Sequence, residues 1–148
     1  MQEINQEIYD KAIKLLSIRL HTTGELHRKL KQRGFKDPDI LPVLRRLEEL
    51  DFLNDERFAQ IFVDNLKRFK DWGYYGIKAK LQQRQIPSDI SAAALSDFFT
   101  ALDEEAVAHR LVGKLKKRKQ ATYEKLARSM QSKGFRMEAI KKALTGLQ

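Results

Sequence analysis

The segment TTGELHRKLKQRGF, residues 22–35, decides the fold, because the chain repeats its pattern twice more. The second copy is GYYGIKAKLQQRQI at residues 73–86, and the third is TYEKLARSMQSKGF at residues 122–135. Apolar residues hold the same places in all three copies, and successive copies are offset by 51 and 49 positions. A repeat of about 50 residues predicts a tandem array of small modules with one shared architecture.

Apolar residues recur at steps of three and four along nearly the whole chain, which is typical of amphipathic helices, and no segment alternates as a strand does. We expect an all-α protein of three tandem three-helix repeats, about nine helices, stacked into an elongated, curved body. The predicted helices span residues 3–20, 22–33, 38–50, 55–71, 74–85, 88–99, 101–118, 122–133 and 137–147. The predicted repeats span residues 1–51, 52–100 and 101–148.

Cap residues support these divisions. Thr22 and Thr100 each precede an acidic residue by three positions, which is the capping-box pattern of a helix start. We expect Asp37 to cap the helix that begins at Pro38, and Asn54 or Asp55 to cap the next one. Glycines at 34, 73 and 134 are predicted to end helices in the left-handed conformation.

Composition excludes several kinds of site. The chain has 148 residues, with 29 Lys and Arg against 20 Asp and Glu, and the resulting net charge of +9 favours polyanionic partners. The absence of cysteine excludes disulfides and thiolate metal sites. The sequence shows neither a secretory signal pattern nor the roughly 20 consecutive apolar residues of a membrane-spanning helix. We therefore expect a cytoplasmic protein without membrane contact.

The sequence offers no catalytic constellation. The three histidines are scattered, and His21 and His27 lie at helix junctions without a carboxylate at metal-ligand spacing. Adjacent acids such as Glu104 and Glu105 are explained by the start of a helix, whose dipole favours negative charge. No serine lies in a nucleophile-elbow pattern. We therefore expect a protein that is not an enzyme and that binds no cofactor and no metal.

The strongest charge run is RLVGKLKKRK at residues 110–119. On a helix whose apolar stripe faces the core, Arg110, Lys114 and Lys117 point away from that core together. One interpretation is a solvated helix face whose lysines suit the negative end of the helix dipole. The other is a surface that faces a polyanion, to which Arg128 of the following helix would add. The sequence leaves both open.

Three aromatic residues lie in the stretch DWGYYG, residues 71–76, at the junction between the first two helices of the middle repeat. Its glycines are too few and wrongly spaced for a phosphate-binding loop. Trp72, Tyr74 and Tyr75 either pack between helices or modules, or form a stacking patch beside the lysines that follow. In either case we expect at least one of the two tyrosines to be exposed.

Residues 43–86, VLRRLEELDFLNDERFAQIFVDNLKRFKDWGYYGIKAKLQQRQI, resemble the signature region of the RecX family, regulators of the bacterial recombinase RecA. The family pattern is a VL..L...G.L.D.RFA block, a helix, a glycine and I...L...GI. The matching positions are Val43, Leu44, Leu47, Leu53, Asp55, Arg57, Phe58, Ala59, Gly73, Ile77, Leu81 and Ile86. Upstream, RLHTTGELHRKLKQRGF at residues 19–35 is similar to the family's EL..KL...GF segment. Asp51 and Gln85 stand where the family has glycine, so we expect these two helices to end without a left-handed residue.

The resemblance implies a regulator of RecA, mainly an inhibitor, active in homologous recombination, DNA repair and the SOS response. Such a protein binds the filament of RecA on single-stranded DNA along its groove and modulates ATP hydrolysis, strand exchange and coprotease activity. The implied partners are the RecA filament and single-stranded DNA, with double-stranded DNA left open, and we expect a monomer. The residues predicted to contact the filament or nucleic acid are Arg68, Lys70, Tyr74, Tyr75, Lys78, Lys80, Arg110, Lys114, Lys117, Arg118 and Lys119.

Two other classes of protein stay open. One is a stand-alone helix-turn-helix-like DNA-binding protein, because three-helix units with a glycine turn present a recognition helix to the major groove. Against it, the predicted helix PDILPVLRRLEEL at residues 38–50 commits its apolar stripe to packing and has no Asn or Gln to read bases. The other is a helical scaffold for an unrelated protein partner.

Overall fold

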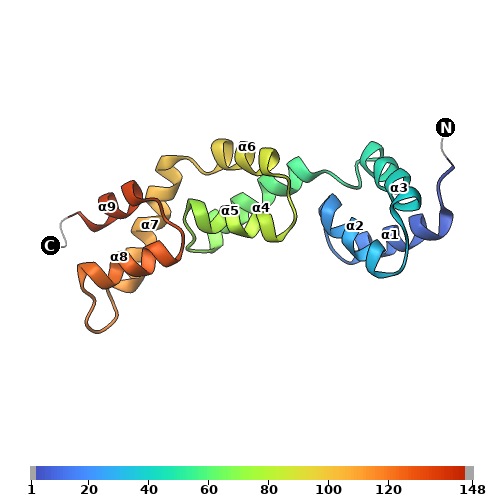
Figure 1. Ribbon diagram of the computed structural model, residues 1–148. Helices are drawn as coiled ribbons and strands as arrows, with labels where there is room; N and C mark the ends of the chain where they lie inside the picture. The colour runs from blue at the N-terminus through green and yellow to red at the C-terminus, as the bar shows by residue number, and fades with distance from the viewer. Residues whose placement is uncertain (1–2, 146–148) are drawn as a thin grey trace.

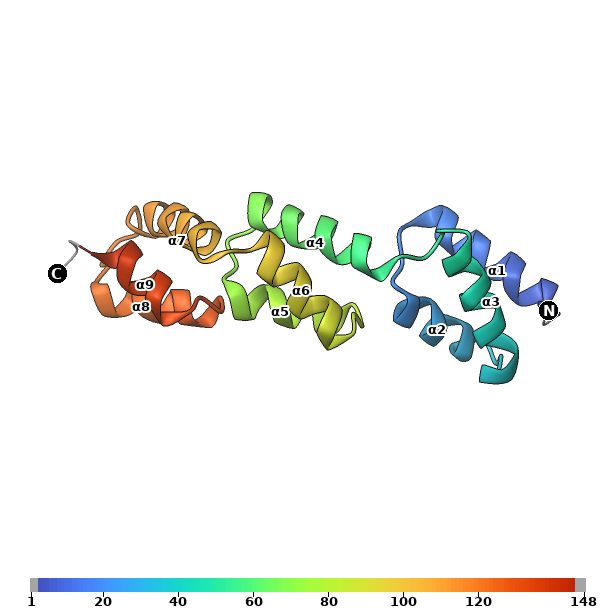
Figure 2. The same ribbon diagram turned by 90° about the horizontal axis from the view of Figure 1, so that it is seen from above.

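The computed structural model describes residues 3–145, and within that range the chain forms nine α-helices and no strand. The helices lie in an elongated row, and the two ends of the chain are at opposite ends of it (Figures 1 and 2). The predicted all-α repeat fold is therefore confirmed. The helices are α1 Gln6–Ile18, α2 Thr23–Gln32, α3 Asp37–Glu49, α4 Asp55–Phe69, α5 Tyr74–Gln83, α6 Ser88–Phe98, α7 Ala101–Leu115, α8 Tyr123–Ser132 and α9 Met137–Leu144.

One predicted helix stop is wrong, and one helix is shorter than predicted. α4 ends at Phe69, and Gly73 is not its left-handed stop, since its φ is −86° and it is the N-cap of α5. The chain is extended there because the Gly73 amide donates to the carbonyl of Lys133 in a distant turn, at 2.9 Å. α7 ends at Leu115, where its apolar stripe ends, and the next four residues, 116–119, are exposed. All other described bounds agree within three residues, and the end predicted at residue 147 lies outside the described residues.

The capping boxes at Thr22 and Thr100 are confirmed. Each threonine hydroxyl accepts a hydrogen bond from the backbone amide of the third residue of its helix, and the carboxylate of that residue accepts one from the threonine amide. Asn54, one of the two predicted caps of α4, accepts from a first-turn amide in the same way. The cap predicted at Asp37 is wrong. Lys36 holds the cap position, and the Asp37 carboxylate instead reaches back to α2, where it lies 2.8 Å from Nε2 of His27.

The turn between the second and third helix of each repeat contains a left-handed residue. Gly34 and Gly134 have φ of 96° and 82°, as predicted. Gln85 holds this position in the second repeat with a φ of 61°, and Asp51, in the turn between α3 and α4, has a φ of 62°, so the expectation that their helices end without a left-handed residue is wrong. Aspartate tolerates this conformation, and here its carboxylate accepts a bond of 2.6 Å from Arg57.

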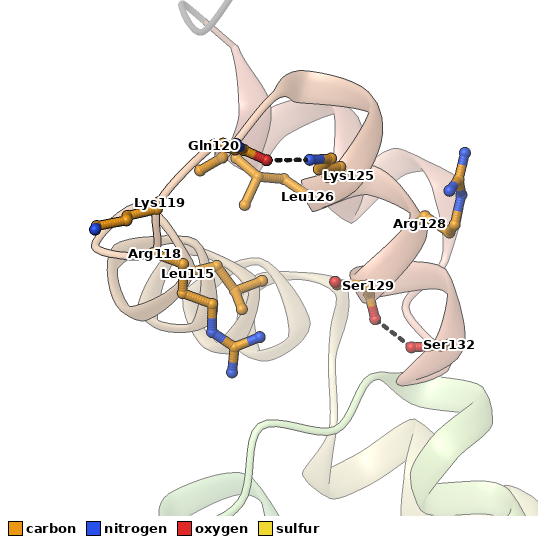
Figure 3. Close-up of a pocket in the computed structure, with 10 residues that line it drawn as sticks. Leu115, Arg118, Lys119, Gln120, Lys125, Leu126, Arg128, Ser129 and Ser132 are labelled. Carbon is orange, nitrogen blue, oxygen red and sulfur yellow. Dashed lines mark hydrogen bonds between the residues drawn. The ribbon is translucent and has the colours of Figure 1, made fainter.

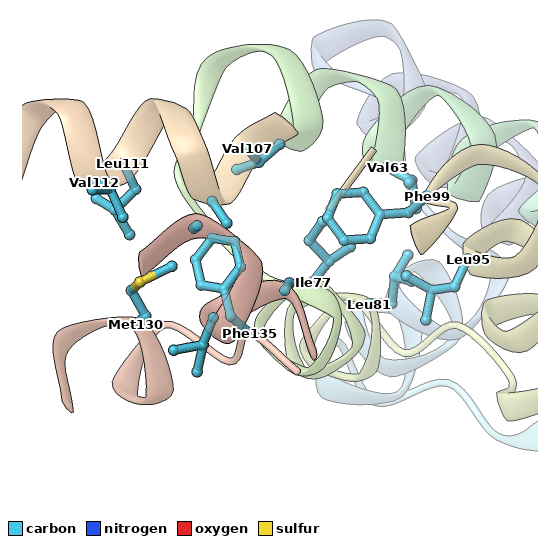
Figure 4. Packing of buried hydrophobic residues seen from close by; sticks show 14 of the residues in the cluster. Val63, Ile77, Leu81, Leu95, Phe99, Val107, Leu111, Val112, Met130 and Phe135 are labelled. Carbon is cyan, nitrogen blue, oxygen red and sulfur yellow. The ribbon is translucent and has the colours of Figure 1, made fainter. Parts of the chain in front are cut away.

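The buried side chains form two separate hydrophobic cores. One lies among α1, α2 and α3 and includes Ile8, Leu26 and Leu47. The other is continuous through all six remaining helices. Figure 4 shows it running from Phe99 through Ile77 to the side chains of the last repeat. The division at residues 51/52 and 100/101 stays a prediction, while burial groups the second and third repeats together.

A polar joint connects the first repeat to the second. It lies between the start of α2 and the α5–α6 turn, and we call it the N-terminal joint. The hydroxyl of Thr22 donates to the carbonyl of Arg84 at 2.6 Å, and the Arg84 guanidinium donates to the buried carboxylate of Glu25 at 2.9 Å. The amide of Thr23 donates to Asp55 at 2.8 Å. Hydrogen bonds and an ion pair therefore hold this joint without a shared hydrophobic core.

An equivalent joint connects the second repeat to the third, between the start of α5 and the α8–α9 turn, and we call it the C-terminal joint. Besides the Gly73 bond, the amide of Tyr75 donates to the carbonyl of Gly134 at 2.8 Å. The backbones touch, since a Cβ on Gly134 would lie 2.7 Å from Cα of Gly76. The aromatic junction of the middle repeat therefore lies at the contact between modules. This agrees with the first of the two sequence-based interpretations, in which the junction packs between modules.

Candidate nucleic-acid interface

The predicted contact residues fall into two groups that the fold brings close together. The central group comes from the end of α4, the following turn and α5, and the distal group from α7 and the turn after it. Arg110 of the distal group joins them, because its guanidinium donates to the carbonyls of Lys67 and Lys70 at 2.9 and 2.8 Å. The carbonyls at the end of α4 are thereby satisfied by a cation from α7.

Asp71 holds two predicted contact residues in place. Its carboxylate accepts a bond of 3.0 Å from Arg110 and one of 2.7 Å from Lys114. Burial would raise the pKa of Asp71, but the bonds from Lys114 and Arg110 outweigh it and leave the pKa below its ordinary value. Arg110 and Lys114 therefore stabilise the contact between α4 and α7, which is a third role beside the solvated and polyanion-facing ones.

We expect Asp71→Asn to lower the free energy of unfolding by on the order of 1 kcal/mol at neutral pH. Because the folded-state pKa of Asp71 is lowered, its stabilising effect is present above the ordinary pKa, 3.8, and is lost as the pH falls through the folded value. The difference between wild type and variant should therefore shrink as the pH drops from 5 towards 2, which denaturant unfolding at several pH values will measure. Asp97→Asn is the control, because this carboxylate is exposed and pairs with no cation in the described part of the chain. A difference that grows in acid would contradict the assignment.

The aromatic residues of the middle repeat have different surroundings. Trp72 is half-buried between two ammonium groups, with Nζ of Lys80 5.0 Å and Nζ of Lys133 4.9 Å from its ring centroid. The ring of Tyr74 is also half-buried, in the C-terminal joint. Tyr75 is 57% exposed, so the prediction of at least one exposed tyrosine is confirmed. Lys78 lies one turn further along α5, on the same helix face as Tyr75.

The central group also includes two cations near the end of α4. Arg68 is exposed and pairs with Asp64 on its own helix at 3.0 Å, while Lys70 is exposed at the C-cap of α4. Of the central group, Lys70, Tyr75 and Lys78 are the exposed side chains for which residues 3–145 provide no ion pair.

The most exposed cations follow α7. Lys117, Arg118 and Lys119 are exposed, and within residues 3–145 no acidic side chain contacts them. Arg118 and Lys119 border a cavity of about 490 Å³ between the end of α7 and α8, and Arg128 lies at its edge on α8 (Figure 3). Leu115 and other apolar side chains form part of its wall. The structure thus combines unpaired positive charge with a hollow that has an apolar lining.

Sequence reasoning missed the residues that hold the joints. Glu104 was interpreted only as part of a helix start, yet its carboxylate is 2% exposed and accepts bonds from the amides of Tyr74 and Arg136. Arg84 was not singled out, although it pairs with Glu25. These partners lie 30 to 59 residues apart, so no local spacing signals them.

The described residues show no arrangement suited to a metal or a membrane. Among residues 3–145, no three or more His, Asp or Glu side chains are grouped so as to hold a metal ion. In the same range, no helix combines the length and the apolar character needed to cross a membrane. The fold and surface define a class, namely tandem three-helix-repeat proteins with a basic surface at one end.

Comparison with known proteins identifies the family. The profile described as "RecX, first three-helix domain" matches residues 9–47, and that described as "RecX, second three-helix domain" matches residues 54–95. The regulatory protein RecX of Prosthecochloris aestuarii is 33% identical over 138 residues, covering 93% of this chain and 91% of that protein. The regulatory protein RecX of Bacillus subtilis is 32% identical over 146 residues, covering 95% of this chain and 54% of that protein. The chain belongs to the RecX family.

Solved structures agree with this assignment. The crystal structure of RecX from Lactobacillus salivarius matches with a TM-score of 0.86 at 25% identity, covering 96% of this chain and 95% of that one. A second crystal structure, of a regulatory protein RecX, matches in fold with a TM-score of 0.84, covering 92% of this chain and 70% of that one. The predicted family resemblance is confirmed.

Proposed function

We propose that this protein regulates the recombinase RecA, mainly as an inhibitor, by lying along the groove of the RecA filament on single-stranded DNA. Membership of a family of regulatory proteins supports the proposal. Besides family membership, the structural observation that supports the proposal is an elongated body (Figure 1) that bears three cations without an acidic partner in the described residues at one end, namely Lys117, Arg118 and Lys119. A stiff repeat body of this kind suits a partner that is itself a repeating polymer. It acts in the cytoplasm as a monomer.

Regulation needs only unequal affinity for the states of the filament. A modulator shifts growth, ATP hydrolysis, strand exchange and coprotease activity by no more than the difference in its binding free energy between those states. The continuous core of α4 to α9 supplies a rigid piece that can bridge neighbouring protomers. The N-terminal joint, which is polar and lacks a shared core, sets the direction of the first repeat.

The contacts are assigned by exposure. Lys117, Arg118 and Lys119 meet DNA phosphates, and Tyr75 and Lys78 meet the filament from the centre of the body. Arg68, Lys70, Tyr74 and Lys80 border this central patch, and Arg110 and Lys114 connect it to the distal end through Asp71. The proposed contacts with DNA therefore depend on the exposed cations, while the paired cations Arg110 and Lys114 hold the surface together.

The test is ATP hydrolysis by the cognate RecA on single-stranded DNA, titrated with this protein. We expect loss of hydrolysis well below one copy per RecA. The triple variant Lys117→Glu, Arg118→Glu, Lys119→Glu should need at least roughly tenfold more protein for the same effect, and its inhibition should depend less on salt, because fewer phosphate counterions are released.

A matched control separates local contacts from total charge. The variant Lys14→Glu, Lys36→Glu, Lys141→Glu changes the net charge equally at exposed positions spread over α1, the α2–α3 turn and α9. It should inhibit nearly as well as wild type. Equal weakening by both triple variants would mean that only the net charge matters, and no inhibition by wild type at an equimolar ratio would overturn the proposed function.

A further inference from the structure

The cavity beside α8 lies where the other two repeats hold an aromatic ring. The repeat offsets of 51 and 49 positions align Trp72 with His21 in the first repeat and with Ala121 in the third. His21 is 4% exposed, and its Nε2 lies 2.8 Å from Nζ of Lys29. Burial lowers the pKa of His21, which keeps this ring neutral beside the lysine.

The second repeat fills the same place with its tryptophan. Trp72 lies beneath Lys80, the residue aligned with Lys29, and packs on Gly76, where a Cβ would be 2.9 Å from the ring atom Cε3. Each of the first two repeats therefore places a ring and a lysine between its first and second helix.

The third repeat has the same frame without the ring. The residues aligned with Trp72, Gly76 and Lys80 are Ala121, Lys125 and Ser129, and all three line the cavity. Leu115 and Leu126, which are buried in the core, supply apolar wall atoms (Figure 3). The volume of about 490 Å³ lies within the range of roughly 300–1,000 Å³ typical of ligand pockets. A planar ring bound there would occupy the space that His21 and Trp72 fill in their own repeats.

The positive charge around the cavity favours a ring that belongs to a negatively charged molecule. Arg118, Lys119 and Arg128 line it together with Lys125, and no acidic residue does. An aromatic side chain of a protein brings no negative charge of its own, whereas a nucleotide places a phosphate within reach of its base. Sequence-independent binding of single strands combines these two elements, a surface for bases and cations for the backbone.

We propose that this cavity receives a base of single-stranded nucleic acid, with the adjoining phosphates held by Arg118, Lys119 and Arg128. The inference deepens the proposed function, because it assigns to the last repeat a contact with the strand on which the recombinase assembles. The base packs against the apolar wall formed by Leu115 and Leu126 and is not read by hydrogen bonds, so the site accepts any base.

The test compares two oligonucleotides of about eight nucleotides, one of thymidylate and one with abasic sites throughout, so that the phosphates are equal and only the bases differ. Binding is measured without RecA by fluorescence anisotropy. Ala121→Trp restores the ring of the second repeat and should weaken binding of the thymidylate strand roughly tenfold, while leaving the abasic strand unchanged. Ala121→Ser leaves the cavity open and should bind both strands as wild type does.

Each outcome decides the assignment. Equal wild-type affinity for the two strands would overturn the assignment and would mean that the protein contacts only the phosphates. Unchanged binding of the thymidylate strand by Ala121→Trp would overturn it as well. If the tryptophan variant lost RecA inhibition but kept strand affinity, the occupant would be an aromatic side chain of the partner protein instead. Circular dichroism checks the fold, and Ala121→Phe gives the same comparison with a smaller ring. Because the strand assay contains no RecA, failure of the proposed function does not affect it.

Discussion

Replacement of Gly134 by alanine is expected to detach the last three helices from the middle three and to lower the free energy of unfolding by at least about 4 kcal/mol. Gly134 has a φ of 82°, which is unfavourable for any residue with a Cβ. An added Cβ would also overlap the amide nitrogen of Gly76 and lie 2.9 Å from the carbonyl carbon of Tyr75. These are backbone atoms, so the clash is relieved only by moving the modules apart.

The chain contains a matched control for this change. Gly34 holds the equivalent position in the first repeat with a φ of 96°, but nothing lies within 4 Å of the place of its Cβ. Gly34→Ala should therefore cost only the backbone strain, about 1–2 kcal/mol. The difference between the two variants isolates the contact between modules.

Denaturant unfolding of both variants measures the difference, and hydrogen exchange locates it. In the Gly134 variant, the amides of Gly73 and Tyr75, which bond to the α8–α9 turn, should lose protection. Their protection should stay unchanged in the Gly34 variant. Equal losses of stability in the two variants would show that the joint tolerates separation at no cost and that the backbone contact is unimportant.

The local features of the fold could be predicted from the sequence because they depend on nearby residues. Capping boxes at Thr22 and Thr100 and the left-handed glycines 34 and 134 are signals within one turn of a helix, and these are confirmed, whereas Gly73, whose amide bonds to a distant turn, is not left-handed. The contact that makes Gly134 irreplaceable is not local. Its partner Gly76 lies far along the chain, and only the docking of two modules brings the residues together.

The same limit explains why the ion pairs at the candidate interface could not be predicted. Arg110 and Lys114 point away from the core of their own helix, as the periodicity predicts, but Asp71 of another module lies there to bind them. The separation of 39 and 43 residues carries no spacing signal. The cavity at Ala121 is different, because aligning the repeats and comparing Trp72 with Ala121 indicates a missing ring from the sequence alone.

The two joints share one geometry but differ in the forces that hold them. Both place the start of a second helix against the turn of the next repeat. Each joint has a buried carboxylate bonded to an arginine, Glu25 with Arg84 and Glu104 with Arg136, but only the C-terminal joint adds a shared hydrophobic core. We therefore expect the second and third repeats to form one rigid body. We also expect the residues that keep this body rigid to affect filament binding without contacting the filament.

Glu104→Ala is expected to lower the free energy of unfolding by about 3 kcal/mol. The carboxylate accepts bonds of 2.8 Å and 3.1 Å from the amides of Tyr74 and Arg136, and one of 2.7 Å from Nε of Arg136. Alanine leaves these donors without their acceptor in a region that excludes water. The Arg136 side chain is 35% exposed, so it regains some hydration and the loss stays below that of a fully buried ion pair.

The neighbouring Glu105→Ala is the matched control, because it makes the same chemical change on the same helix. Among residues 3–145 its carboxylate makes two ion-pair contacts, at 3.9 Å with His109 and 3.8 Å with Lys142, so the expected loss is below about 1 kcal/mol. Glu104→Gln keeps the shape and one acceptor oxygen but turns an NH₂ group towards donors, and should lie between the two. If both alanine variants unfolded at the same denaturant concentration, the buried carboxylate would not hold the C-terminal joint. The rigidity of the body would then come from the hydrophobic core alone.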